Sequence, residues 1–435
     1  MIKTLMNFPR VAIVDGVRTP FVKAGNIFDS VSAQELGRIA MRELLERTGV
    51  EPGIIDEVIF GNVAQPMDAA NVARVIALNA GCPQLVSAQT VSRNCASGMQ
   101  SIATGFDLIR TGSAHVVVAG GTESMSNIPL VFPKSMSHFL DRLSRARTPL
   151  QKLKTLTTLQ LSMFKPIIAL LEGLKDPFCG LNMGQTAQIL ANEFHISREE
   201  QDAFALRSHQ KASAAMKSGR FAQEIAEVFL PSKKTVVSDD VGPRDNQTME
   251  ALAKLKPYFD RKHGSVTVGN SCPITDGASA ILLMSEEKVT QFKIEPIAWI
   301  RSYAFTGLDP RRMGLGPAVA APMALRRAQI KLPSIGLIEI NEAFASQVLS
   351  VLKVFANPKL AENIGIPYSD ELQPIDPSIL NVNGGAIALG HPVGTSGNRI
   401  VLTLAKEMNL RNIQYGLAAI CIGGGQGGAM VIEKS

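Results

Sequence analysis

The sequence has few cysteines, few aromatic residues and no long uninterrupted run of apolar residues. Its five cysteines are spread over 435 residues without a Cys-x-x-Cys pair, which argues against a zinc ribbon or a disulfide scaffold and indicates a reducing compartment. Aromatic residues make up 5% of the chain and tryptophan occurs once, which disfavours a receptor-like β-sandwich. The first ten residues lack the apolar core of a secretory signal, and no apolar run reaches the roughly 18 residues of a membrane span. We therefore expect a soluble cytoplasmic protein.

The composition is typical of a globular protein large enough to bury a substantial core. Hydrophobic residues account for 46% and charged residues for 19% of the chain, so the composition disfavours disorder. At about 150 residues per domain, the length predicts two or three domains.

The formal net charge of +6 is concentrated in one stretch, residues 131–175, which we call the basic segment. It holds eight lysines and arginines against Asp141 and Glu172, and it is rich in leucine. This combination favours an amphipathic element that contacts a membrane surface or a partner protein. No interleaved aromatic residues support nucleic-acid binding. The alternative is a solvated helical hairpin that only covers the core.

Short β-rich runs alternate with helical patterns along the chain, which predicts an α/β fold. Apolar spacing in residues 33–47 predicts a helix that Gly49 ends, and Ser197 with Glu200 three residues later predicts a capping box. We expect strands at 11–14, 57–60, 115–119, 298–304, 335–340 and 415–422, and helices at 33–47, 99–110, 197–219 and 396–407.

Two parts of the sequence repeat the same order of elements. A Cys-Ala-Ser-Gly turn leads into a helix, a strand and two glycines in the first part, and a Gly-His-Pro turn leads into a helix, a strand and three glycines in the second. Two similar halves that face each other would bring both turns to one cleft. We predict an N-terminal half (1–126, completed by about 250–284), an inserted domain over the cleft (127–249) and a C-terminal half (285–435).

Cys95 and His391 are the first candidates for chemistry. Cys95 lies among small polar residues just before an apolar helix, where the helix dipole and backbone N–H groups lower a thiol pKa from about 8.5 toward neutrality. The alternative is a buried structural cysteine. His391 lies in a stretch of six glycines in fourteen residues, which leaves space for a substrate, and a histidine pKa near 6.5 suits a general base.

Cys421, Gly423 and Asn341 are further candidates. Cys421 ends an apolar strand that continues into Gly423 and its neighbouring glycines, whose backbone N–H groups can form an oxyanion hole. A phosphate cradle is the weaker interpretation, because no Gly-Lys-Ser/Thr follows. Asn341 follows a predicted strand, where its amide can hold a water or an oxyanion, although a helix N-cap is the alternative.

Taken together, these motifs resemble the thiolase family over nearly the whole chain. They occur in order as Asn-Cys-Ala-Ser-Gly around Cys95, Asn-Glu-Ala-Phe from Asn341, Gly-His-Pro around His391, and Cys-Ile-Gly-Gly-Gly from Cys421. The resemblance implies a five-layered αβαβα core of two similar halves. It also implies that coenzyme A thioesters are substrates, that CoA is a co-substrate, and that no metal or permanent cofactor is needed.

The resemblance assigns roles to these residues. His391 takes the proton of Cys95, the thiolate accepts the acyl group, and Cys421 protonates the leaving carbanion. His391 and a water held by Asn341 stabilise the enolate, and the N–H groups of Cys95 and Gly423 hold the acyl oxyanion.

Four further residues are expected to bind CoA by the same resemblance. Arg220 matches a family stretch that contacts the nucleotide, although a solvated residue after a helix is the alternative. Met183 lies in an Asn-Met-Gly stretch where short-chain members have His-Met-Gly. Ser271 and Cys272 replace the usual Ala-Ser, so the serine that binds pantetheine is either displaced to Ser271 or replaced by the thiol of Cys272.

Residues 133–175 resemble the insertion of thiolase subunits in fatty-acid-oxidation trifunctional complexes. This favours a 3-ketoacyl-CoA thiolase of β-oxidation, with a homodimer or higher oligomer, an α-subunit partner and peripheral membrane contact through 133–175 as expectations. That subgroup usually has His-Glu-Ala-Phe, whereas this chain has Asn341. The alternatives are an acetoacetyl-CoA thiolase working in the condensing direction and a non-catalytic lipid-binding protein.

Overall fold

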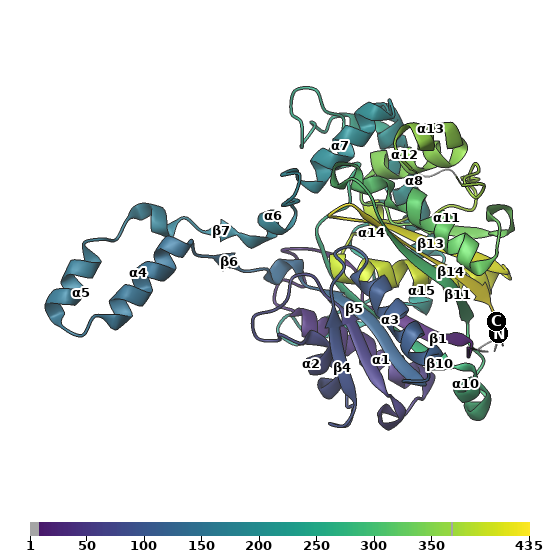
Figure 1. Ribbon diagram of the computed structural model, residues 1–435, viewed down its shortest axis with the longest axis horizontal. Helices are drawn as coiled ribbons and strands as arrows, with labels where there is room; N and C mark the ends of the chain where they lie inside the picture. The colour runs from purple at the N-terminus through teal and green to yellow at the C-terminus, as the bar shows by residue number, and fades with distance from the viewer. Residues whose placement is uncertain (1–7, 367–368) are drawn as a thin grey trace, which may run out of the picture.

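The computed structural model describes residues 8–366 and 369–435, so the first seven residues of the predicted N-terminal half lie outside the described residues. A ten-stranded sheet forms the centre of the molecule (Figure 1). Its strands are β1 (Val11–Arg18), β2 (Val22–Lys23), β3 (Glu57–Gly61), β4 (Ser87–Val91), β5 (Val116–Glu123), β10 (Thr275–Ser285), β11 (Ala298–Gly307), β12 (Leu337–Ile340), β13 (Tyr415–Ile422) and β14 (Gln426–Lys434).

The strand order is β12-β13-β14-β11-β1-β10-β5-β3-β4, with β2 beside β10. Strand β3 is parallel to β4 and β5, β12 is parallel to β13, and the remaining pairs are antiparallel. The two parts of the sheet meet where β1 pairs with β11. Each predicted strand occurs, and β13 has the predicted bounds.

Helices of the body cover the outer faces of the sheet, and further helices lie between the two parts of the sheet. They are α1 (Ala33–Thr48), α2 (Val72–Asn79), α3 (Ser97–Arg110), α7 (Met183–Glu193), α8 (Arg198–Lys217), α9 (Met249–Ala253), α10 (Glu286–Phe292), α11 (Gly316–Ala328), α12 (Ala345–Ala356), α13 (Pro358–Asn363), α14 (Ala386–Leu389) and α15 (Val393–Arg411). A small hairpin, β8 (Val228–Leu230) and β9 (Thr235–Val237), lies beside them. The predicted capping box holds, because Ser197 accepts from the backbone N–H of Glu200 and the Glu200 side chain returns to Ser197.

Alternating strand residues divide the core into layers. In β10, Leu282 and Met284 face a cluster with α1 and α2, whereas Ile281 and Leu283 face a cluster with α3 and α15. In β13, Leu417 and Ala419 face a third cluster that includes α11 and α12. The layers are therefore helices, sheet, the central pair α3 and α15, sheet and helices, which is the five-layered αβαβα fold that the resemblance implied.

The central helices cross at unusually short range because each has a glycine at the crossing. A Cβ at Gly98 of α3 would lie 2.8 Å from the backbone nitrogen of Asn398, and a Cβ at Gly397 of α15 would lie 2.7 Å from that of Met99. Any side chain here would push the two helices apart. The close crossing holds the two N-termini, and therefore the Cys95 and His391 turns, in a fixed relation.

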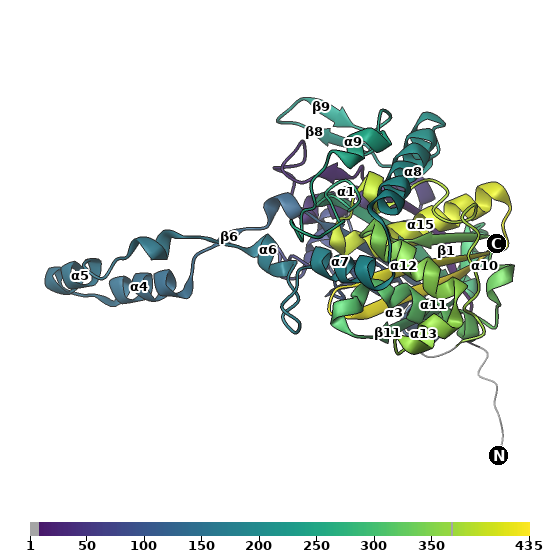
Figure 2. The same cartoon turned by 90° about the horizontal axis from the view of Figure 1, so that it is seen from above.

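The basic segment leaves this layered body instead of covering it. A ribbon of β6 (Leu130–Val131) and β7 (Ile167–Ile168) carries α4 (Lys134–Arg145) and α5 (Pro149–Leu156) far from the sheet, and α6 (Ala169–Gly173) leads back (Figures 1 and 2). We call residues 130–168 the arm.

The placement of the arm corrects two expectations. The arm does not lie over the cleft as part of the inserted domain, and it is not a hairpin that covers the core. Only the later part of the insertion returns to the body, where α7 and α8 pack on α12. The arm has its own small core of Met136, Phe139 and Met163, which is separate from the clusters of the main body. Among the described residues, no helix combines the length and apolar character needed to cross a membrane.

Candidate active site

The predicted reactive residues lie at the ends of core elements. Cys95 precedes the first turn of α3, and His391 lies two residues before the start of α15. Cys421 is the penultimate residue of β13, and Asn341 follows β12 directly. Cys95 is half-buried, whereas Cys421, His391 and Asn341 are 1%, 7% and 0% exposed. The site is therefore built on rigid elements and is largely closed to solvent.

Cys95 and the loop after β13 are tied together. Asn94 takes a left-handed backbone conformation with φ of 44°, and its Nδ2 donates to the carbonyl of Gly423 over 2.7 Å. The backbone N–H groups of Cys95 and Gly423 both stabilise a charge on the Cys95 sulfur. The structure thus brings together the two donors expected to form the acyl oxyanion hole.

Burial nevertheless raises the pKa of Cys95 above its ordinary value, so the expectation of a lowered pKa is wrong. The loss of water around the sulfur outweighs the two N–H donors, and the buried carboxylate of Glu123 opposes a further negative charge. Cys95 therefore remains a thiol in the free protein, and its activation requires a base.

Three sulfurs share the site. Burial raises the pKa of Cys421 well above its usual range, and the nearby Cys95 and Cys272 raise it further. Burial, followed by the charge of Cys95, raises the pKa of Cys272 to about 12. The bond from Asn94 to Gly423 holds the residues beside Cys95 and Cys421 together, so the two thiols converge although they are distant in sequence. The high pKa of Cys421 suits a proton donor.

His391 is held in one tautomer by Ser396. The Ser396 hydroxyl donates to the carbonyl of Pro392 over 3.0 Å and lies 2.6 Å from His391 Nδ1. When the Ser396 hydroxyl donates to Pro392, Nδ1 is the donor of the His391–Ser396 pair, and Nε2 keeps a free lone pair. Burial, and secondarily the positive charge of Arg399, lowers the pKa of His391 to about 4, so the expected value near 6.5 is wrong. His391 is a neutral acceptor at neutral pH.

Asn341 and His391 carry unused hydrogen-bonding capacity. Asn341 Oδ1, Asn341 Nδ2 and His391 Nε2 are buried and have no hydrogen-bond partner among the described residues. The segment from Ser271 to Ile274 links them, because Ser271 forms a β-bridge with Phe344 and Ile274 forms one with His391. Buried polar groups are normally bonded, so these groups fit a substrate oxygen, reached directly or through a water.

The predicted CoA-binding residues fall into two groups. Met183 adjoins the oxyanion loop, since a Cβ at Gly423 would lie 3.1 Å from its sulfur. The backbone N–H of Cys272 donates to the carbonyl of Ala343, and its side chain faces the other thiols. Ser271 instead donates its hydroxyl to the carbonyl of Thr267 over 2.6 Å. The hydroxyl of Ser271 is thus bonded within the protein, and the pantetheine contact of Ser271 or Cys272 stays a prediction.

The guanidinium of Arg220 is bonded within the protein. The residue is buried, and its guanidinium donates to Glu407 over 2.5 Å, to Glu224 over 3.3 Å and to the carbonyl of Thr403. These bonds join the end of α8 to α15, so the expected nucleotide contact is corrected to a structural ion pair. The post-helix position in the sequence could not distinguish the two, because the pairing partners are distant in the chain.

Two residues that sequence reasoning missed support the site. Ser396 orients His391. Glu123 accepts from the backbone N–H of Gly394 over 2.9 Å and of Val63 over 3.1 Å, which joins the two halves at the start of α15. Burial raises the pKa of Glu123 to about 7. The Thr-Glu-Ser-Met-Ser stretch that begins with the last two residues of β5 was a signal for Glu123, whereas nothing local distinguishes Ser396 from other helix residues.

Comparison with known proteins gives a consistent picture. The models of the thiolase N-terminal domain and the thiolase C-terminal domain match residues 11–287 and 294–434. A 3-ketoacyl-CoA thiolase of Yersinia enterocolitica is 41% identical over 426 residues, which cover 98% of this chain and 97% of the relative.

Solved structures are also similar. An acetyl-CoA acetyltransferase of Bacillus anthracis is 37% identical with a TM-score of 0.85, over 98% of this chain and 99% of the other. Human mitochondrial 3-ketoacyl-CoA thiolase is 36% identical with a TM-score of 0.85 over the same shares.

Proposed function

This chain belongs to the thiolase family, and from that premise we propose that it is a 3-ketoacyl-CoA thiolase, an acyltransferase of fatty-acid β-oxidation. It cleaves 3-ketoacyl-CoA with CoA to give acetyl-CoA and an acyl-CoA shortened by two carbons. Acyl-CoA and CoA are its substrates, and CoA is consumed rather than permanently bound. The observation that carries the proposal is the contact of three chain segments. Asn94, beside Cys95, binds Gly423 after Cys421, and the backbone N–H of His391 donates to the carbonyl of Pro273, the neighbour of Cys272.

In the first stage, Nε2 of His391 takes the proton of Cys95, and the sulfur attacks the ketone carbon. The bond between C2 and C3 breaks, and its electron pair passes to the acetyl-CoA fragment as an enolate. A water held by Asn341 and the imidazolium stabilise the enolate oxygen, and the thiol of Cys421 protonates C2. The raised pKa of Cys421 keeps this proton available at neutral pH.

In the second stage, CoA attacks the acyl group on Cys95. The Cys421 thiolate accepts the proton of the CoA thiol, and the imidazolium returns its proton to Cys95 as the acyl group leaves, so both protons balance. The N–H groups of Cys95 and Gly423 hold the tetrahedral oxyanion in each stage. A donor aimed in this way is worth about 3–4 kcal/mol.

The test follows the absorbance of the magnesium enolate of 3-ketoacyl-CoA substrates from C4 to C16. We expect loss of absorbance only when CoA is added. No CoA-dependent loss with folded protein at any chain length would reject the proposal and leave a non-catalytic lipid-binding role. The similarity to an acetyl-CoA acetyltransferase supports a second candidate function, that of an acetoacetyl-CoA thiolase. Activity confined to the C4 substrate would favour this candidate.

We propose the predicted domain division, with the halves 1–126 (completed by 250–284) and 285–435 and the insertion 127–249, and a homodimer or higher oligomer. Strand β4 ends the sheet and has no β partner on its outer side among the described residues. An open strand edge next to the Cys95 turn is a natural place for pairing with a second copy. Light scattering that gives a monomer mass at micromolar concentration would contradict the oligomer.

We also propose that the arm binds an anionic membrane surface. Leu150 and Leu161 are 77% and 90% exposed on it, and the basic segment carries eight lysines and arginines. Exposed leucines beside basic residues suit the interface of a bilayer, where each lysine or arginine near anionic lipid contributes about 1 kcal/mol. An α subunit of an oxidation complex is the alternative partner.

A further inference from the structure

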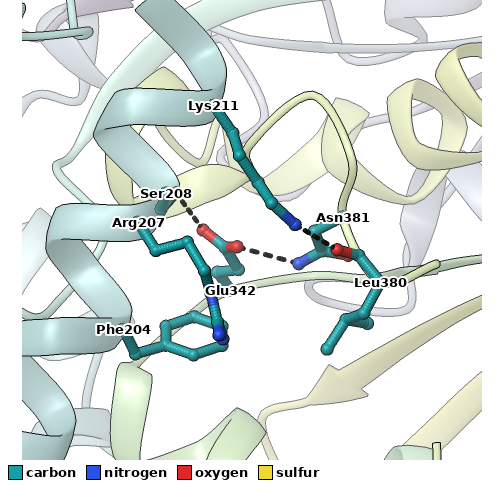
Figure 3. Close-up of a pocket in the computed structure, with 7 residues that line it drawn as sticks. All are labelled: Phe204, Arg207, Ser208, Lys211, Glu342, Leu380 and Asn381. Carbon is teal, nitrogen blue, oxygen red and sulfur yellow. Dashed lines mark hydrogen bonds between the residues drawn. The ribbon is translucent and has the colours of Figure 1, made fainter. Parts of the chain in front are cut away.

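Glu342, the residue after Asn341, is a buried carboxylate with no assigned role. Its side chain is 1% exposed. Ser208 donates its hydroxyl to one carboxylate oxygen over 2.6 Å, and Asn381 donates its Nδ2 to the other over 2.8 Å, as Figure 3 shows. The backbone N–H of Ile387 adds a third donor over 3.3 Å.

The three donors come from three separate parts of the chain. Ser208 belongs to α8, Asn381 to the loop before α14, and Ile387 to α14 itself. Asn381 also binds the last residue of β12, because its amide accepts from the N–H and donates to the carbonyl of Ile340. The carboxylate therefore joins the strand that presents Asn341 to the segment that ends in His391.

The packing around the carboxylate is tight. A Cβ at Gly385 would lie 2.3 Å from the carboxyl carbon of Glu342, and the N–H of Gly385 donates to the hydroxyl of Ser208. The backbone before α14 is thus in direct contact with the Glu342–Ser208 pair. Lys211 lines the same small cavity, but its Nζ donates to the carbonyl of Leu380 and not to the carboxylate.

We propose that Glu342 is a positioning residue that fixes the separation of Asn341 and His391, and thereby serves the carbon–carbon bond step more than acyl transfer. This inference rests on the proposed function. Both Asn341 and His391 stabilise the enolate oxygen. A change in the distance between these two residues therefore weakens the stabilisation of the enolate and slows the carbon–carbon step. Acyl transfer at Cys95 needs His391, the two backbone N–H groups and proton transfer between Cys421 and CoA, but not Asn341.

The test compares two reactions of the full-length protein. Thiolysis of a 3-ketoacyl-CoA requires the carbon–carbon step, whereas exchange of an acyl group between acyl-CoA and isotopically labelled CoA requires only acylation of Cys95. In Glu342→Gln, an amide NH₂ must face either the Asn381 amide or the Ile387 N–H, both of which are donors. We expect the kcat ratio of thiolysis to exchange to fall on the order of tenfold, with KM for the ketoacyl substrate changed less than about twofold.

Matched variants separate positioning from a loss of stability. Lys211→Met alters the same cavity without touching the carboxylate, so its ratio should equal that of the wild type. Ser208→Ala removes one bond to Glu342 and should lower the ratio in the same direction by about threefold, which keeps the proposal testable if Glu342→Gln does not fold. Parallel losses of both reactions, or an unchanged ratio in Glu342→Gln and Ser208→Ala, would overturn it. Absence of thiolysis in the wild type would instead reject the proposed function.

Discussion

The hydroxyl of Ser396 lies 2.6 Å from Nδ1 of His391 and donates its own proton to the carbonyl of Pro392. This pair fixes which nitrogen of the imidazole is free. The Nδ1–H points to Ser396, and the Nε2 lone pair is left for the proton of a thiol. A side chain on the first turn of α15 thus determines whether the neutral histidine can act as a base.

Replacing Ser396 by alanine should impair the activation of Cys95. The Nδ1–H loses its acceptor, so the tautomer with a proton on Nε2, which cannot take a proton from the thiol, becomes populated. We expect the rate of Cys95 acylation by acyl-CoA to fall on the order of tenfold. Rapid-quench mass spectrometry measures it, and Ser396→Thr, which keeps the hydroxyl, should retain more activity. A wild-type rate in Ser396→Ala would contradict the assigned tautomer.

The stability of the protein should depend on His391 at acidic pH. Its pKa is about 4 in the folded state and about 6.5 when unfolded. Between these values the imidazole is protonated only in the unfolded chain, so the contribution of His391 to the free energy of unfolding falls as pH drops below 6.5, by about 2 kcal/mol from pH 7 to pH 5. Urea unfolding at both pH values checks this. The His391→Gln variant should show a correspondingly smaller drop, and an identical drop would disprove the assignment.

A side chain at the helix crossing should destabilise the whole core. In Gly98→Ala the new methyl would meet the backbone of Asn398 at 2.8 Å, and backbone cannot rotate away as a side chain can. We expect a loss of about 1–3 kcal/mol in the free energy of unfolding, measured with urea. Gly53→Ala is the matched control, because its Cβ would meet only Pro83 at 4.0 Å. Equal stability of the two variants would mean that the two helices can move apart at the crossing without loss of stability.

Deletion of residues 136–174 should leave thiolysis intact and weaken binding to vesicles that contain phosphatidylserine. Cosedimentation with these vesicles and with uncharged phosphatidylcholine vesicles separates the electrostatic contribution to binding from the apolar one. The triple variant with Leu150, Leu153 and Leu161 changed to serine keeps the charge and tests the apolar part. Binding that persists in the deletion would refute the membrane proposal, and binding only to a β-oxidation α subunit would replace it.

The fold was largely predictable from the sequence, because its signals are local or periodic. The spacing of apolar residues in α1 and the capping box at Ser197 predict helices directly. The family resemblance carried by the four ordered motifs implies the five layers of the core. The pKa directions of Cys95 and His391 were not predictable from position alone. Backbone N–H groups lower the pKa of Cys95 as expected, but the larger effect of desolvation depends on residues from other elements. Similarly, the partners of Arg220 include Glu407, which is 187 residues away, and the direction of the arm depends on the short ribbon that carries it.

The most direct test of the account is the intact mass of three alanine variants after incubation with an acyl-CoA that has no ketone. Cys421→Ala should gain the mass of one acyl group yet show no thiolysis of 3-ketoacyl-CoA, whereas Cys95→Ala should gain nothing. Cys82→Ala, at a buried thiol that packs in the outer core cluster with α1 and α2, should behave like the wild type in both respects. Equal loss of acylation in the Cys95 and Cys421 variants would contradict the division of work between the two sulfurs.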